Sequence, residues 1–234
     1  MKKTLLPTKD VMKSAFIKSL PVMCSYLFIG LAYGMAMQES GFAWYWAAIV
    51  SATVYTGAFQ FVLTTFMASG ASLVTVALTA LLMNSRQTFY ALTFLNDFKA
   101  MGKRRFYMIH TLTDETYAVN CSLTELPDTE RRDTMFTVAV LSRIYWIVSS
   151  ALGAIIGQLL PFQLEGIDFC MTAMFVVIMI DQWEKADNHA PALAGLGIGT
   201  ACLLLFGASR FMLPALLITS ALLIITGGKE TAAK

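Results

Sequence analysis

The stretch MFTVAVLSRIYWIVSSALGAIIGQLL, residues 135–160, decides the fold class. Its side chains are almost all apolar or small, and Arg143 is its single charged residue. A helix rises by about 1.5 Å per residue, so about 20 apolar residues cross the hydrocarbon core of a bilayer. The stretch therefore predicts a helix that spans a membrane.

Other segments of the chain repeat this pattern. Long apolar segments lie at 15–37, 42–66 and 71–95, shorter ones at 165–181, 191–207 and 211–227, and a weaker, more polar one at 106–121. The shorter segments are marginal for a full crossing. We predict an all-α fold, a polytopic transmembrane helical bundle with about six to seven crossings that forms one integral membrane domain over 1–234.

The composition supports this prediction. Of 234 residues, 57% are hydrophobic and 14% are charged, whereas a soluble domain needs roughly a quarter of its residues charged. The net charge of +2 is small and scattered, so nucleic acid is not an expected partner and the lipid bilayer is. The cysteines are far apart and predict small apolar packing rather than a redox role; they are Cys24, Cys121, Cys170 and Cys202.

The distribution of basic residues raises a question of topology. Four lysines lie among the first 13 residues, which predicts a cytoplasmic N-terminus and an uncleaved first helix. The basic segment Asn96–Arg105 is also predicted to be cytoplasmic. Three complete crossings before Asn96 would place that segment outside, so the two predictions conflict.

Two interruptions inside 42–95 offer a resolution. Thr56-Gly57-Ala58 and Ser69-Gly70-Ala71-Ser72 mark places where a helix could stop within the membrane and start again. We therefore expect broken or re-entrant helices in 42–95. The alternative is that the charge rule fails here. Small-residue pairs that predict close helix packing are Gly30/Gly34, Gly153/Gly157 and Gly195/Gly199.

Gln60 is a lone amide in an apolar run beside Gly57 and Phe59. A helix interrupted at Gly57 would free backbone N–H groups, and a half-helix N-terminus favours anions. This pattern suits a ligand that carries a carboxylate. The alternative is that Gln60 hydrogen-bonds a neighbouring helix.

Three further polar groups stand in or beside apolar segments, namely Arg86, the stretch His110–Tyr117 and Arg143. Arg86, two residues after Asn84, could reach the cytoplasmic surface or line a substrate route and pair with a carboxylate. His110–Tyr117 is either an interfacial amphipathic helix, with Thr113 as its N-cap, or a short buried helix that presents Asp114 and Glu115 inward. Metal binding by His110 is not expected.

Arg143 lies within the deciding stretch and needs compensation if it is buried. Its nearest acidic residues in the sequence are Asp114 and Glu115; alternatively it lies near the headgroups. The mixed-charge stretches Glu125–Asp133 and Gln182–His189 are predicted to be solvated loops.

The residues exclude the common intramembrane enzymes. There is no Gly-x-Ser-x-Gly elbow, no His-Glu-x-x-His zinc motif and no pair of aspartates within the membrane segments. A transport protein is the better prediction, without a cofactor, and a channel or a structural membrane subunit is the alternative.

The order of these motifs resembles a known family. Gly57-Ala58-Phe59-Gln60-Phe61, then Asn84-Ser85-Arg86, then Leu112-Thr113-Asp114-Glu115-Thr116-Tyr117 look like the AzlC family of branched-chain amino-acid exporters. Trp146, Gly153, Gly157 and the stretches 166–169 and 173–175 are similar to the second half of that family.

This resemblance implies a multi-pass exporter of hydrophobic amino acids such as valine, leucine, isoleucine or methionine in a bacterial cytoplasmic membrane. It also implies a small, separate membrane subunit of the AzlD type as a partner. Together with the polar residues, it gives the candidate substrate-binding set Gly57, Phe59, Gln60, Asn84, Arg86, Asp114, Glu115 and Arg143.

Overall fold

The computed structural model describes residues 9–159, 176, 179–180, 183–184, 188–207, 211, 214–215 and 217–222, with backbone alone at Arg86 and Phe89. The chain divides into two compact units. The first comprises Met1–Ala68 and Ser85–Met171, and the second comprises Ser69–Asn84 and Thr172–Lys234. The single domain over 1–234 therefore stays a prediction.

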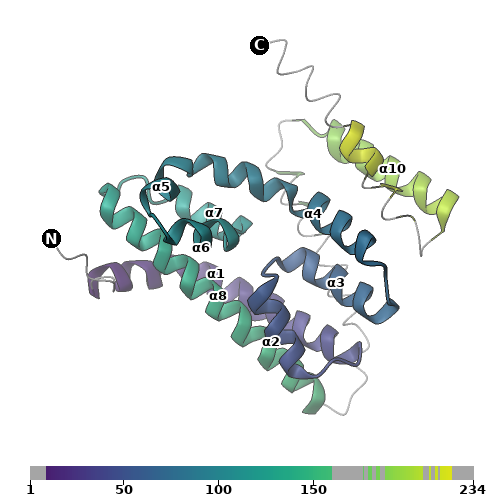
Figure 1. Cartoon of the computed structure of the whole chain (residues 1–234), viewed down its shortest axis with the longest axis horizontal. Helices are drawn as coiled ribbons and strands as arrows, with labels where there is room; N and C mark the ends of the chain where they lie inside the picture. Colours follow the sequence, from purple (N-terminus) through teal and green to yellow (C-terminus); the bar gives the residue numbers. More distant parts are fainter. Residues whose placement is uncertain are drawn as a thin grey trace, which may run out of the picture. The chain divides into compact units, whose positions relative to one another are not determined.

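The regular structure of the described residues is helical, as predicted (Figure 1). The helices are α1 Lys9–Glu39, α2 Trp44–Thr53, α3 Gly57–Ser69, α4 Leu73–Thr93, α5 Leu95–Ala100, α6 Arg104–His110, α7 Asp114–Cys121, α8 Asp128–Leu159 and α10 Ala190–Phe206.

Two of these helices, α1 and α8, are long and apolar enough to cross a membrane. Shorter apolar helices are α3, the part Leu73–Ser85 of α4, and α10. Most of the predicted segment 165–181 and about half of the segment 211–227 lie outside the described residues. The expected number of six to seven crossings therefore stays a prediction.

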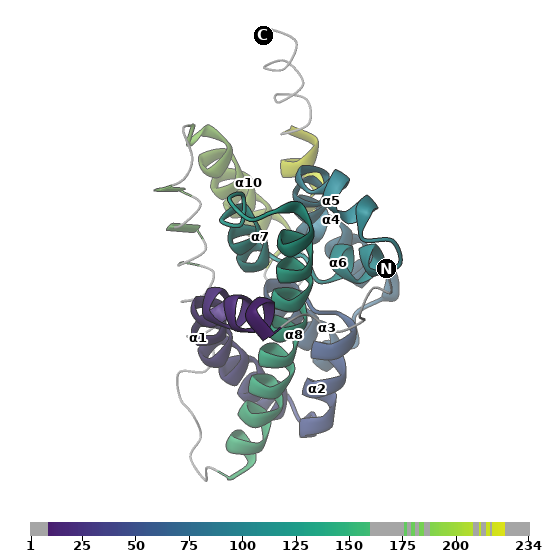
Figure 2. The same ribbon diagram turned by 90° about the vertical axis from the view of Figure 1, so that its left-hand side faces the viewer.

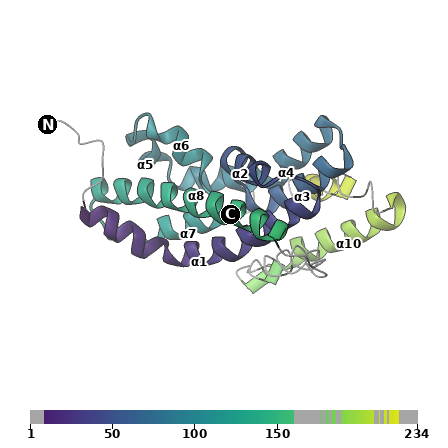
Figure 3. The same cartoon turned by 90° about the horizontal axis from the view of Figure 1, so that it is seen from below.

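In the first unit, α1 and α8 lie side by side along most of their length (Figure 3). A Cβ atom built on Gly34 would lie 2.5 Å from the backbone nitrogen of Ala154, and one on Gly153 would lie 2.7 Å from the Cα of Leu31. Such distances require the two backbones to be almost in contact, so the close packing predicted for these glycines is confirmed. Residue numbers rise together along the contact, so the two helices are parallel.

The third glycine pair is different. A Cβ built on Gly195 would make ordinary contact with Thr219 at 3.7 Å, and one on Gly199 would meet no described atom within 4 Å. The prediction of close packing is therefore not met at this pair in the described part of the second unit.

Two ion pairs join the basic segment Asn96–Arg105 to the start of α8. Arg131 in α8 binds Asp97 in α5 at 2.7 Å, and Arg104 in α6 binds Asp133 in α8 at 2.8 Å. Since α1 and α8 are parallel, α5 and α6 lie at the end of the bundle where both long helices begin (Figure 1). The chain that leaves α1 at Glu39 has therefore returned to its starting end by α5.

This return uses broken helices, as the sequence predicted. The helix α2 ends at Thr53 and α3 begins at Gly57, while α3 ends at Ser69 and α4 begins at Leu73. Gly70 has a φ of +65°, which a residue without a Cβ adopts easily. With 10 and 13 residues, α2 and α3 are each too short to cross about 30 Å of hydrocarbon.

Two sequence predictions need correction. Asp128–Asp133, predicted to be part of a loop, forms the first turns of α8, because its charged side chains pair with α5 and α6. Among the described cysteines, Cys202 is buried whereas Cys24 and Cys121 are exposed, so an internal packing role holds for Cys202 alone. Cys170 lies outside the described residues.

Candidate functional site

The break between α2 and α3 lies at mid-depth in the bundle. Arg143 occupies the midpoint of the 32-residue helix α8 and lies about 14 Å along its axis from Thr134, where the apolar part begins. Its Nη2 donates a hydrogen bond to the backbone carbonyl of Ala52, in the last turn of α2. In the second view, α2 lies against α8 (Figure 2). The end of α2 is thus held near the middle of a membrane-length helix.

The surroundings explain why a charge is tolerated at this depth. The last carbonyl groups of a helix carry a partial negative charge, which a cation stabilises. The guanidinium of Arg143 also lies 5.7 Å from the ring centre of Tyr55 and 5.4 Å from that of Tyr107. Its partner is therefore a helix end and two aromatic rings.

This finding corrects the expected partner. Among the described ion pairs, none joins Arg143 to Asp114 or Glu115, the acidic residues nearest in the sequence. Its position halfway along α8 also disagrees with the alternative of an arginine near the headgroups.

Tyr55 makes the turn between the two half-helices. Its φ is +49°, in the left-handed region that residues with a Cβ seldom adopt, and its side chain is buried. Such a conformation costs on the order of 1–3 kcal/mol and persists where the surrounding structure imposes it. The bond between Arg143 and Ala52, directly before this turn, supplies such a constraint.

Gln60 connects three parts of this region. Its Oε1 accepts hydrogen bonds from the backbone N–H of Thr56 at 3.1 Å and from Nε1 of Trp146 at 3.0 Å. Its Nε2 donates to Oγ of Ser51 at 3.2 Å. The side chain is fully buried, and it joins α2, the break and α8. The alternative in which Gln60 hydrogen-bonds neighbouring helices is therefore realised, and the hydroxyl of Tyr33 on α1 also lies beside this amide.

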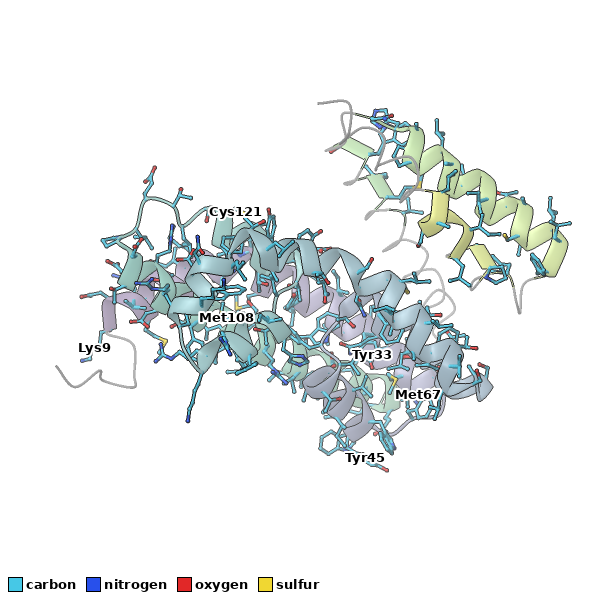
Figure 4. The ribbon with its side chains drawn as sticks, turned by 45° about the horizontal axis from the view of Figure 1, so that its top comes forward. Lys9, Tyr33, Tyr45, Met67, Met108 and Cys121 are labelled. Atoms are coloured by element: carbon cyan, nitrogen blue, oxygen red, sulfur yellow. The ribbon has the colours of Figure 1, made fainter. Side chains whose placement is uncertain are left out.

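Aromatic side chains surround this amide. The indole of Trp146 packs edge-on against Tyr26, with ring centres 5.1 Å apart, and is stacked with Tyr33 at 6.0 Å. Tyr33 in turn packs edge-on against Phe61 at 5.4 Å. Figure 4 shows Tyr33 inside the helices, and its side chain is fully buried. A Cβ on Gly57 would lie 3.5 Å from the Trp146 ring, so the indole covers the start of α3.

The site predicted from the sequence did not include Tyr26, Tyr33 or Trp146. Tyr26 and Tyr33 are seven residues apart, so they share one face of α1. Two tyrosines on one face of a membrane segment were the available signal. Phe59, which was predicted, is buried in α3.

The predicted segment His110–Tyr117 is divided between two helices, because α6 ends at His110 and α7 begins at Asp114. Thr113 is the N-cap of α7, as predicted; it forms a capping box with Thr116, and Asp114 and Glu115 lie in the first turn. Glu115 also faces inward, because its Oε2 accepts a hydrogen bond from the hydroxyl of Tyr26 at 3.0 Å. The same hydroxyl lies 2.8 Å from Oγ1 of Thr113.

A continuous set of contacts therefore links the break to a carboxylate. It runs from Gln60 through Trp146 and Tyr26 to Glu115. Asp114 is half-buried beside Glu115. Asn84 belongs to the second unit, where it is half-buried in α4, and the side chain of Arg86 lies outside what the structure describes.

Comparison with known proteins identifies the family. The family model of the AzlC protein matches residues 21–160, which is more than half of the chain. The chain belongs to the AzlC family. The matched residues include the break between α2 and α3, the start of α7 and the whole of α8, so the region built around Gln60 lies inside the AzlC match.

Several relatives match most of the chain. The branched-chain amino acid transport protein AzlC of Bacillus subtilis (strain 168) is 35% identical, over 88% of this chain and 81% of its own length. An uncharacterized membrane protein of Helicobacter pylori (strain J99) is 37% identical, over 91% and 93%. The inner membrane protein YgaZ of Escherichia coli (strain K12) is 26% identical, over 84% and 80%.

Membership of the AzlC family places the chain among transport proteins rather than enzymes. The relatives named as membrane proteins agree with the long apolar helices α1 and α8. No solved structure matches the chain.

Proposed function

We propose that this protein exports branched-chain or other hydrophobic amino acids, namely valine, leucine, isoleucine and methionine, from the bacterial cytoplasm. It would be a multi-pass protein of the cytoplasmic (inner) membrane with a cytoplasmic N-terminus. The observation that carries the proposal is the helix break at mid-depth, where α2 ends on Arg143 and α3 begins under Trp146. The name of the Bacillus subtilis relative supports the substrate class.

The start of α3 suits the carboxylate of the amino acid. Backbone N–H groups near Gly57 belong to the first turn of a helix, and their partial positive charge attracts anions. The neighbouring end of α2 carries the opposite partial charge and would repel a carboxylate. Arg143 neutralises that end, so the break as a whole favours an anion. The second amide N–H of Gln60 would complete the carboxylate site.

The ammonium group requires an acidic partner, for which we propose Glu115 or Asp114. Glu115 is supported by its hydrogen bond to Tyr26, whose ring contacts Trp146 beside the break. The aliphatic side chain would lie against Phe59, Phe61 and the neighbouring aromatic rings. Asn84 and Arg86 complete the proposed set along the substrate route.

Transport would proceed by alternating access around this break, because discontinuous helices let one part of a bundle move against another around a fixed site. A change of protonation at Asp114 or Glu115 would couple export to the proton gradient. In this view, the strained turn at Tyr55 is the position where α2 and α3 change their relative direction.

A small membrane subunit of the AzlD type is the proposed partner. In the second unit, α10 has 17 residues and exposes Leu204 and Leu205 at 82% and 78%. A short helix with a broad apolar surface is stabilised when another helix packs against it. The second candidate function is a channel or a structural subunit. The exposed apolar surface of α10 favours it too, because such a surface can also hold subunits together in an assembly that does not transport amino acids.

Uptake of labelled valine into inverted vesicles tests these proposals. The chain would be expressed alone and together with its proposed partner, and vesicles without either protein would be the control. We expect saturable uptake that is competed by leucine and isoleucine, and that increases when the partner is present. Uptake no greater than in control vesicles under both conditions would contradict the transport function, and equal uptake with and without the second subunit would remove the need for a partner.

A further inference from the structure

A mixed basic and apolar surface covers the outside of α5 and α6. Its apolar members are Leu95, Phe106 and Ile109, which are 43%, 65% and 50% exposed. Its basic members are Lys99, Lys103 and Arg105, all exposed. We call these six residues the α5–α6 surface. None of them is used in the site around Gln60.

This surface is firmly attached to the first unit. Phe98 of α5 and Met108 of α6 are buried in one hydrophobic cluster with Leu112, Leu123 and Met135. The ion pairs Arg131–Asp97 and Arg104–Asp133 join the same two helices to α8. The exposed face is therefore a fixed feature of the fold rather than a loose loop.

The positive charge of the surface is not neutralised by its own neighbours. The carboxylates of Asp97 and Asp133 are engaged by Arg131 and Arg104. Among the described residues, no ion pair involves Lys99, Lys103 or Arg105. The guanidinium of Arg105 lies 4.8 Å from the ring centre of the exposed Phe106, which couples a basic and an apolar member of the surface.

The contacts of α6 place this surface beside the point on α8 where its charged residues give way to apolar ones. Arg104 binds Asp133, the last charged residue before the apolar part of α8. One turn later in α6, the ring of Tyr107 lies 5.6 Å from that of Phe136 and near Arg143. The helix α6 thus runs from the charged end of α8 toward its apolar middle. A membrane boundary near Asp133 would put the basic groups of this surface at headgroup level, with Phe106 and Ile109 toward the acyl chains.

We propose that the α5–α6 surface is a binding site for anionic phospholipids. Lys99, Lys103 and Arg105 hold the headgroup phosphates, and Phe106 and Ile109 contact the acyl chains below them. Three basic residues that form no ion pair with the described carboxylates favour an anionic lipid over a zwitterionic one, because the cation of a zwitterionic headgroup offsets its phosphate. This inference is independent of what the protein transports and in which direction.

Tryptophan fluorescence in reconstituted vesicles tests the site. The full-length chain with Phe106→Trp would be placed in mixtures of phosphatidylcholine and phosphatidylglycerol in which one lipid at a time is brominated, and the signal of the parent chain would be subtracted. We expect brominated phosphatidylglycerol to quench the indole introduced at position 106 more strongly than brominated phosphatidylcholine does at equal mole fraction. The preference should decrease with added salt, because salt screens exposed charges.

Charge variants separate a specific lipid site from a general attraction of the basic protein to an anionic membrane. In Lys99→Gln/Lys103→Gln/Arg105→Gln, the preference for phosphatidylglycerol over phosphatidylcholine should fall by about fivefold for each charge removed, until both lipids quench equally. The matched control Lys9→Gln/Lys13→Gln, which removes charge from α1 at the same end of the bundle, should leave the quenching at position 106 unchanged. Equal quenching by both brominated lipids in the parent, or an unchanged preference in the triple variant, would overturn the proposal. Absence of quenching by either lipid would also overturn it, because the surface would then lie outside the bilayer.

Discussion

At the scale of single residues, the amide of Gln60 has both a structural role and a proposed role in binding. Gln60→Ala would leave the N–H of Trp146 buried without its acceptor, which costs about 1–3 kcal/mol of stability, and would remove the acceptor of the half-buried Thr56 N–H as well. If the amide also binds the substrate carboxylate, the apparent affinity for valine should fall about tenfold. Thermal unfolding and valine export, measured on the same preparations, check both effects.

Two further variants separate the roles of Gln60. Trp146→Phe keeps an aromatic ring and removes one hydrogen bond to the same oxygen, so we expect lower stability with export retained at matched abundance. Gln60→Glu keeps the accepting oxygen but places a negative charge beside the substrate carboxylate, so export should be lost. Normal export by Gln60→Glu would show that the carboxylate binds elsewhere.

The acidic pair Asp114 and Glu115 gives a second prediction at the residue scale. Asp114→Asn should cost about 1 kcal/mol or less of stability, because it weakens one interaction with the N-terminus of α7. Glu115→Gln keeps an oxygen that accepts the hydrogen bond from Tyr26, so it should fold as well as the parent. If the carboxylates meet the ammonium group or carry a proton, both variants should be abundant and inactive in valine efflux. Efflux at the parental rate in both would leave these carboxylates only their structural role in the first turn of α7.

At the scale of helices, the parallel contact of α1 and α8 should depend on its glycines. In Gly153→Ala the new methyl group would lie 2.7 Å from the Cα of Leu31, so the helices must separate, at a cost of about 1–3 kcal/mol or more. Gly199→Ala in α10 is the matched control, since its methyl group meets no described atom within 4 Å. There the better helix propensity of alanine should leave stability unchanged or slightly higher. Thermal unfolding in mild detergent checks this prediction, and equal effects of the two substitutions would contradict it.

The break between α2 and α3 is also a property of elements rather than of residues. The glycine and the polar residues at Thr56-Gly57 indicate where a helix can stop, and the structure confirms the position. What holds the two half-helices is a third element, α8, through Arg143 and Trp146 one turn apart. A break within a membrane needs such a neighbour, because freed backbone groups must be satisfied by protein or enclosed water.

At the scale of the whole chain, the prediction concerns which end of the first unit faces the cytoplasm. α5 and α6 lie at the end where α1 and α8 begin, and the basic residues there predict a cytoplasmic position. In a cysteine-free background, a cysteine at the exposed position Ala100 should therefore resist an impermeant maleimide in intact cells.

Ser40→Cys is the matched control for this experiment. Ser40 is exposed just after the far end of α1, so its thiol should react from outside. Rapid labelling at position 100 together with protection at position 40 would reverse the topology. Labelling of both positions from outside would contradict the arrangement in which the chain returns to its starting end before α5.

The sequence by itself determined the features that depend on neighbours along the chain. Residues 135–160 predicted a membrane-length helix, the glycines near 57 and 70 predicted the helix ends, and Thr113 predicted a cap, because hydrophobic runs, backbone freedom and capping act within a few residues. The glycine pairs of α1 and α8 predicted close packing, because small residues serve that role wherever they meet.

Only the tertiary structure decided which elements meet. Arg143 binds Ala52, 91 residues away, and not the acidic residues nearest in the sequence, while Trp146 reaches Gln60 across 86 residues. Asp128–Asp133 is helical because its charges find partners on α5 and α6. These outcomes depend on which helices pack against α8. A contact between distant helices depends on the packing of whole faces, which local sequence patterns do not encode.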